Sequence, residues 1–274
     1  MPLPRAVDAI LPVTPAAAVE DPSLLPADLR TPSILNPISP TDLIARMDTY
    51  AIAQSIIPAR TYGQRWGVSY ESLRDYVAEY PQRLFATAGI CPLSRMDGVR
   101  RFEESVSDFG FVGVHAYTSW SGVPINDRLY YPYYSKAEEL GVPFQLETMG
   151  GKQRMWQGRP EYLDQVAADF PDLQLVAAHA GYPWEREVVG MAEFRTNVYI
   201  GMDTLMPNAW TDDLLAFIRG TGYGGTQWIG SQSSPMFCAP AIGASSAPTT
   251  CRCPSTASSA RSMSSGSIRA RGPS

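Results

Sequence analysis

Three side chains that can carry acid–base chemistry stand at the ends of apolar runs: His115, Glu147 and His179. These runs are predicted strands, and the carboxyl ends of parallel strands meet at one edge of a sheet or barrel. We therefore expect the three groups to face one catalytic site. Two imidazoles and a carboxylate can bind a metal with open positions, or they can form an acid–base set without a metal. Because the ordinary pKa of histidine is about 6.5, His179 can serve as a general base or a general acid.

Each of these residues also has a plain structural interpretation. A single histidine at a strand end, such as His179, is usually a hydrogen-bonded structural residue. His115 would then lie in a partly exposed aromatic loop, and Glu147 at a solvated strand end. Asp203 follows a further apolar run and is another candidate carboxylate, for which a helix cap or a loop position is the simpler interpretation.

Aromatic and basic side chains near the same strand ends are candidates for substrate binding. Tyr117, Trp120 and Trp184 can line a pocket for a planar substrate, or they can pack at its rim. Arg159 can bind a substrate carboxylate, with a solvated basic loop as the plain alternative.

Apolar runs alternate with amphipathic stretches along the chain, which predicts parallel strands separated by helices. Eight such units in about 230 residues favour an α/β fold of the (β/α)8 TIM-barrel type over an open doubly wound sheet. The predicted strands are 7–11, 54–58, 84–90, 111–116, 143–147, 173–179, 198–202 and 226–230. The predicted helices are 41–49, 70–80, 96–109, 131–140, 161–170, 184–194 and 212–219.

The domain organisation that we expect is a barrel over residues 1–237 and a different segment over 238–274. Residues 13–40 are rich in proline and are predicted to form a long first loop that can cover the barrel mouth. After Asp213 the chain has no acidic residue, and 238–274 is dominated by small and polar types. This segment is either a disordered extension or the product of a reading-frame slip, in which case the barrel is incomplete at its eighth helix.

Composition excludes several classes of protein. The net charge of −5 provides no general attraction to nucleic acid or to an anionic membrane, and no apolar run reaches the roughly 18 residues that span a bilayer. Three of the four cysteines fall in the last 37 residues, a pattern unlike a disulfide framework. We therefore expect a cytoplasmic protein with a small-molecule substrate. Barrel enzymes are often dimers, so a homo-oligomer is one possible state of this protein.

Three stretches of the chain resemble the amidohydrolase family. The most specific is DFPDLQLVAAHAGYPW at residues 169–184, and the others are GVHA with NDRLYYPYY between 113 and 134 and NVYI at 197–200. Together these stretches extend the resemblance over roughly residues 40–235. The resemblance implies a (β/α)8 barrel whose relatives hydrolyse C–N, C–O or C–C bonds, or decarboxylate aromatic and unsaturated acids.

The resemblance also implies a divalent metal, often zinc, whose usual ligands are largely replaced in this chain. Members of the family hold the metal with an HxH pair on the first strand, a histidine after the fifth and an aspartate after the eighth. Ile10 and Pro12 stand at the HxH positions, and Gln232 stands where the aspartate is expected. His179 matches the family's sixth-strand histidine, which acts on the metal-bound water. With two histidines in the chain, a three-histidine zinc site is excluded.

The sequence therefore leaves three hypotheses for function. The first is an amidohydrolase-family hydrolase or decarboxylase that acts on a small carboxylic acid, lactone or amide. It would need no metal, as in the family's pyrone-dicarboxylate lactonases, and would use His179 as the base with Glu147 or His115 as its partner. The second is a non-catalytic barrel that binds a small molecule or a partner subunit, and the third is a defective gene product.

Overall fold

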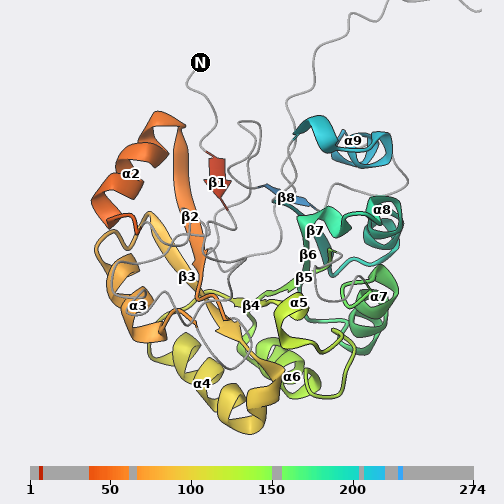
Figure 1. Ribbon diagram of the computed structural model, residues 1–274, viewed down its shortest axis with the longest axis horizontal. Helices are drawn as coiled ribbons and strands as arrows, with labels where there is room; N and C mark the ends of the chain where they lie inside the picture. The colour runs from red at the N-terminus through yellow and green to blue at the C-terminus, as the bar shows by residue number, and fades with distance from the viewer. Residues whose placement is uncertain are drawn as a thin grey trace, which may run out of the picture.

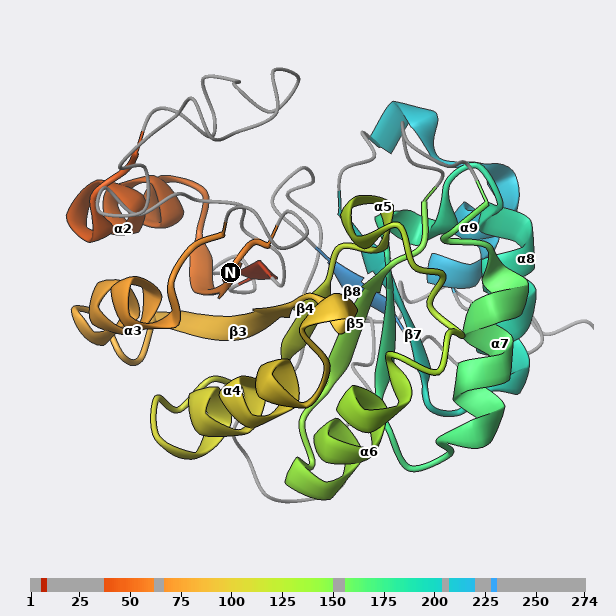
Figure 2. The same ribbon diagram turned by 60° about the horizontal axis from the view of Figure 1, so that its bottom comes forward.

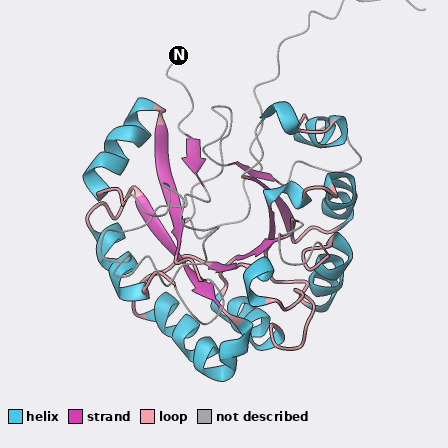
Figure 3. Ribbon diagram, viewed as in Figure 1, coloured by secondary structure: helices cyan, strands magenta, loops and turns pink. Residues whose placement is uncertain are grey.

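A computed structural model describes residues 6–8, 37–61, 67–149, 156–203, 207–219 and 228–230 of the chain. Over these residues the fold is a curled sheet of eight parallel strands, with helices on its outside (Figures 1 and 3). The strands are β1 (Ala6–Asp8), β2 (Ile52–Pro58), β3 (Leu84–Ile90), β4 (Val114–Ala116), β5 (Phe144–Glu147), β6 (Leu175–Ala178), β7 (Val198–Met202) and β8 (Trp228–Gly230).

Strand order in the sheet follows the order of the chain, from β1 to β8, and every recorded pairing is parallel. This topology requires a crossover after each strand, and helices supply it. The helices are α2 (Pro40–Thr49), α3 (Tyr70–Ala78), α4 (Arg95–Ser107), α5 (Thr118–Ser121), α6 (Tyr131–Leu140), α7 (Pro160–Asp169), α8 (Glu185–Phe194) and α9 (Asp212–Ile218). Figure 2 shows α3, α4, α6, α7 and α8 packed around the outside of the strands. The α/β barrel that the sequence predicts is confirmed.

The strands place apolar side chains outward against the helices and polar side chains inward. On β5, Phe144 and Leu146 are fully buried in the main core, where the Phe144 ring lies 4.7 Å from that of Tyr134 on α6. Successive side chains of a strand point to opposite faces, so Gln145 and Glu147 face the barrel interior. The same alternation puts Val198, Ile200 and Met202 of β7 in the outer core. The fold thus reserves the inner face of these strands for chemistry.

Local sequence signals explain where several helices begin and end. Ser39 and Ser69 accept hydrogen bonds from backbone amides in the first turns of α2 and α3, as N-caps do. Helix α6 ends at Gly141, which adopts the left-handed conformation with a φ of +66°. The predicted end of this helix at residue 140 is confirmed.

Most predicted elements agree with the structure to within a few residues. Strands 84–90 and 198–202 and helix 131–140 match β3, β7 and α6 in full. The predicted strand 111–116 is longer than the regular strand β4, which covers Val114–Ala116, although Val112 and Gly113 already form backbone hydrogen bonds with β3. The first loop up to residue 36, the segment 238–274 and any eighth helix lie outside the described residues. No helix in the described ranges is long and apolar enough to cross a membrane.

Candidate functional site

His179 lies directly after β6, in a tight left-handed turn. His179 and Ala180 have φ angles of +62° and +50°, a conformation that L residues adopt rarely and that often marks functional sites. Gly181 completes the turn with a φ of +76°, and a Cβ at this position would lie 2.3 Å from Cγ2 of Val188. The turn therefore requires a glycine and aims the buried imidazole across the end of the barrel.

Asp203 holds this turn and the imidazole together. Its Oδ1 accepts a hydrogen bond from the backbone N of His179 at 2.7 Å, and its Oδ2 lies 2.5 Å from His179 Nδ1. Asp203 follows β7 and lies outside regular secondary structure, as the loop interpretation expected. Its carboxylate is buried and binds His179. Asp203 thus sets which nitrogen of His179 faces the rest of the site.

The charges of this pair shift both pKa values. Burial, the largest effect on His179, favours the neutral ring. The charge and hydrogen bond of Asp203 and the charge of Glu147 oppose it, and the pKa of His179 is raised. Burial also acts to raise the pKa of Asp203, but the His179 charge and hydrogen bonds outweigh it and lower that pKa. The two shifts together favour an imidazolium beside a carboxylate.

Glu147, at the end of β5, brings a second carboxylate to His179. Its Oε1 lies 3.9 Å from His179 Nε2, on the ring edge opposite Asp203. Its Oε2 accepts hydrogen bonds from the backbone N of Ser119 at 3.0 Å and from Ser119 Oγ at 2.5 Å. The interpretation of Glu147 as a solvated strand end is wrong, because the side chain is buried. The structure brings His179 and Glu147 together, as predicted.

His115, on β4, lies in the interior of the same barrel. Its Nδ1 donates a 2.6 Å hydrogen bond to Oε1 of Gln145, the residue paired with it on β5. Its Nε2 has no hydrogen-bond partner among the described residues. The expected partly exposed loop is wrong, because His115 is fully buried on a strand. Its recorded hydrogen bond is to Gln145, so it stands beside the His179 and Glu147 pair without bonding to it.

Burial lowers the pKa of His115 to about 4, and the hydrogen bond that His115 donates to Gln145 and the nearby charges of His179, Asp203 and Arg60 modify that effect. A histidine with a lowered pKa takes up a proton on unfolding, so its stabilising effect is present above about pH 6.5 and is lost as the pH falls toward 4. We expect the free energy of unfolding to fall by roughly 3 kcal/mol over this range through His115, at about 1.4 kcal/mol per pKa unit.

Urea denaturation at pH 7 and pH 4.5 measures this effect. The His115→Gln variant keeps a polar side chain but cannot titrate, so its loss of stability between the two pH values should be smaller by about 2–3 kcal/mol. His179 and Asp203 are present in both proteins, so the larger part of their own effect on stability cancels in this comparison. An equal loss in the two proteins would contradict the assignment.

The four predicted substrate-binding residues fall in two groups. Tyr117 packs against His115, with ring centroids 4.2 Å apart and the rings tilted by 46°, and Trp120 lies in the short helix α5 that follows. Arg159 precedes α7, and its guanidinium lies 5.7 Å from the ring centroid of Trp184. Arg159 also lies 3.3 Å from Glu161, so part of its charge is already balanced.

Two residues of this cluster were not found by sequence reasoning. Ser119 binds Glu147, 28 residues away in the chain, and Gln145 binds His115, 30 residues away. The alternation along β5 was a usable signal for Gln145, because it shares the inward face with Glu147. Ser119 carries no comparable signal, since it lies in a stretch without helical or strand periodicity.

The residues of the site do not fit the divalent metal of the family. His179 Nδ1 is held by Asp203, and one oxygen of Glu147 is held by two donors of Ser119. Within the described ranges, no three His, Cys, Asp or Glu side chains are arranged to hold a metal ion. Ile10 and Pro12, which the resemblance places at the HxH positions, have no donor atoms in their side chains. Among the described residues, the groups that the structure brings together here are the acids and bases of His179, Glu147 and Asp203.

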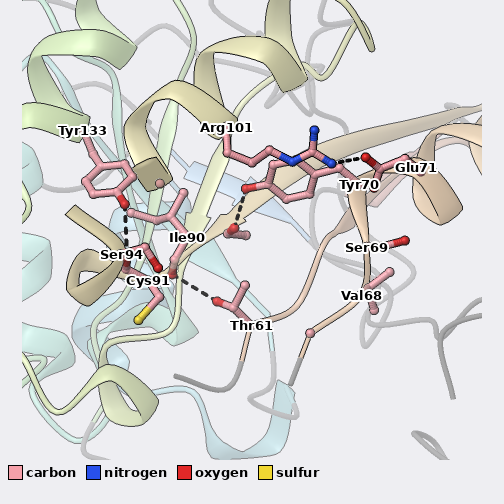
Figure 4. A pocket seen from close by; sticks show the side chains of 13 residues that line it. Thr61, Val68, Ser69, Tyr70, Glu71, Ile90, Cys91, Ser94, Arg101 and Tyr133 are labelled. Atoms are coloured by element: carbon pink, nitrogen blue, oxygen red, sulfur yellow. Dashed lines mark hydrogen bonds and ion pairs between the residues drawn. The ribbon is translucent and has the colours of Figure 1, made fainter. Parts of the chain in front are cut away.

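A separate open cleft of about 630 Å³ lies between α3 and α4, near the ends of β2 and β3 (Figure 4). Its polar lining includes the paired Arg101 and Glu71, and Tyr70 Oη donates a 2.6 Å hydrogen bond to the carbonyl of Gly89. Tyr133 Oη donates to the carbonyl of Cys91 at 3.1 Å. Its lining does not include His115, Glu147 or His179, so the cleft is distinct from the histidine cluster.

Comparison with known proteins agrees with this architecture. The amidohydrolase family model matches residues 26–219. A 2-keto-4-carboxy-3-hexenedioate hydratase of a Sphingobium strain is 28% identical over 149 residues, which cover 44% of this chain. That match spans 43% of the hydratase, less than half of its length.

Two solved structures share the fold. An uncharacterised TIM-barrel protein of Bordetella bronchiseptica has a TM-score of 0.68 at 22% identity, covering 85% of this chain and 87% of that one. A 5-carboxyvanillate decarboxylase of Sphingomonas paucimobilis has a TM-score of 0.62 at 15% identity, covering 83% and 88%. Since the family model matches more than half of the sequence, the chain belongs to the amidohydrolase family.

Proposed function

We propose that this protein is a metal-independent amidohydrolase-family enzyme that hydrolyses or decarboxylates a small carboxylic acid, lactone or amide. The observation that carries the proposal is the position of His179, buried between Asp203 at 2.5 Å and Glu147 at 3.9 Å. Groups with perturbed pKa values that gather at the end of a barrel are typical of catalytic sites. The named relatives, a hydratase and a decarboxylase, support a small acid as the substrate.

The raised pKa of His179 favours a proton donor over the base that the sequence suggested. In hydrolysis, Nε2 of the imidazolium would protonate the leaving oxygen or nitrogen, while Glu147 accepts a proton from the nucleophile. In decarboxylation, the same proton would go to the carbon that loses carbon dioxide. Both reactions need one acid and one base within reach of the same substrate, and His179 and Glu147 can fill these roles.

The substrate would lie between this pair and the rim residues. Tyr117 and Trp120 offer aromatic surface on the side of β4, and Arg159 with Trp184 offers a cationic and aromatic edge on the other. Such a mixture suits a planar acid or an unsaturated lactone. The assignment of these four residues to substrate binding remains part of the proposal.

The alternative, a non-catalytic barrel, is supported by the replaced metal ligands at Ile10, Pro12 and Gln232. Burying an imidazole and two carboxylates has a desolvation cost that can exceed the gain from pairing them, and a binding protein has no need for this arrangement. The close approach of His179 and Glu147 therefore favours the enzyme.

Turnover after removal of metal tests the proposal. Protein dialysed against a chelator would be incubated with lactones and with aromatic and unsaturated carboxylic acids, and each would be followed by mass spectrometry. We expect turnover of at least one compound that the chelator does not change and that falls on the order of 100-fold or more in His179→Gln. Glu104→Gln, in a half-buried ion pair with Arg101 on the outer helix α4, should retain wild-type activity. Activity that requires added metal, or that survives in His179→Gln, would contradict the proposal.

A further inference from the structure

Ser119 is held against a carboxylate in a way that can activate its hydroxyl. Its Oγ donates a 2.5 Å hydrogen bond to Glu147 Oε2, and only 7% of the residue is exposed. The backbone N of Ser119 donates to the same oxygen at 3.0 Å, which fixes the direction of the carboxylate. A hydroxyl within hydrogen-bond reach of a base that a third group orients is the arrangement found at activated nucleophiles.

The base belongs to a longer series of buried groups. Glu147 reaches from Ser119 on one oxygen to His179 on the other, and His179 reaches on to Asp203. The end of β5 and helix α5 are tied together by Thr118 Oγ1, which donates to the backbone O of Glu147 at 2.8 Å. A hydroxyl, a carboxylate, an imidazole and a second carboxylate therefore stand in sequence on one framework.

Neighbouring hydroxyls lack this relation. Ser121 Oγ donates to the carbonyl of Thr118 and lies 3.0 Å from Tyr130 Oη. The Thr118 hydroxyl is committed to a carbonyl, which cannot accept its proton in catalysis. Ser119 alone among these three has a carboxylate to take its proton.

We propose that Ser119 is a nucleophile that forms a covalent acyl-enzyme with esters or lactones. This inference rests on the proposed function and narrows its substrates to O-acyl compounds. It adds Ser119 to the catalytic residues and gives Glu147 the role of its base. Covalent catalysis of this kind divides one difficult hydrolysis into two easier steps.

In the first step, Ser119 Oγ bonds to the acyl carbon and its proton passes to Glu147 Oε2. The bond from that carbon to the leaving oxygen breaks, and the leaving oxygen takes a proton from His179 Nε2. A water molecule then attacks the acyl carbon and returns a proton to His179. The bond to Oγ breaks, and Ser119 recovers its proton from Glu147. The sum is one ester or lactone and one water converted to an acid and an alcohol.

Reaction with diisopropyl fluorophosphate tests the nucleophile without knowledge of the substrate. We expect the intact protein to gain the mass of one diisopropylphosphoryl group with loss of fluoride, and peptide fragmentation to place it on Ser119. Glu147→Gln keeps the shape of the base but cannot take the proton, so labelling should slow on the order of 100-fold or more. Ser121→Ala is the matched control and should label at the wild-type rate.

The labelling results test the covalent role of Ser119 separately from the proposed function. Wild-type protein that stays unlabelled under conditions that fully label a serine protease, or a Ser119→Ala protein that labels equally, would overturn the covalent role. Labelling of Glu147→Gln at the wild-type rate would overturn it as well. If Ser119→Ala does not fold by circular dichroism, the fragment map of the wild-type adduct decides instead. Unlabelled protein that still turns over lactones without metal would overturn the serine step and leave the proposed function intact.

Discussion

The Asp203→Asn protein is expected to lose activity by a factor on the order of 10²–10⁴, the range that a positioned acid contributes to a reaction. Asparagine keeps the size of the side chain, and its oxygen can still accept from the backbone N of His179. It removes the negative charge that raises the pKa of His179 against the effect of burial. The pKa of His179 then falls, so a smaller fraction of the imidazole carries the proton that it must donate.

The change is measured as kcat and kcat/KM on the substrate that the wild type turns over, with the pH profile of both. The acidic form of His179 should be lost at lower pH in the variant, so its activity should decline at a lower pH than that of the wild type. Asp213→Asn is the matched control, because Asp213 lies at the surface in a loose ion pair with Arg186. Equal activity in Asp203→Asn and Asp213→Asn would contradict the role of Asp203.

The Phe144→Ala protein is expected to lose about 3–5 kcal/mol of unfolding free energy, which is comparable with the whole stability of a marginal domain. Phe144 is fully buried on the outer face of β5, where its ring packs edge-on to Tyr134 of α6. Its removal leaves a cavity behind the strand that carries Gln145 and Glu147 inward. The damage should therefore reach the site as well as the core.

Urea denaturation measures this loss, with Phe194→Ala as the control. Phe194 is also a helix-layer phenylalanine, but 81% of it is exposed, so its replacement should change stability by about 0.5 kcal/mol or less. Losses of similar size in the two variants would show that the outer face of β5 is not the packed core described above.

The strands and helices could be predicted from sequence where burial follows a simple period. On β3 and β7 the apolar run and the paired strand coincide, so their bounds were correct. On β4 the apolar run begins at Phe111, which packs against Tyr70 in the outer core, before the regular strand starts at Val114. Apolar content reports burial, so it could not separate these buried residues from the regular strand.

The candidate site could be predicted only in part, for a related reason. His115, Glu147 and His179 end or follow consecutive strands, so the topology alone indicated that they share one end of the barrel. His179 is bound by Asp203, 24 residues away in the chain, and Glu147 is bound by Ser119, 28 residues away. No local pattern encodes such contacts. The left-handed turn at His179 was equally hidden, because a positive φ is uncommon for residues other than glycine and alanine, at position 180, gives no signal for it.

The most direct test of the account is an NMR titration of the two histidines, since the chain contains only His115 and His179. With isotope-labelled histidine, the His115→Gln variant assigns both sets of ring signals. We predict that His179 titrates above its ordinary value of about 6.5 and loses this elevation in Asp203→Asn, while His115 stays neutral down to a pKa of about 4. A His179 that is neutral at pH 6, or that titrates identically in Asp203→Asn, would contradict the central claim that two carboxylates hold it as an acid.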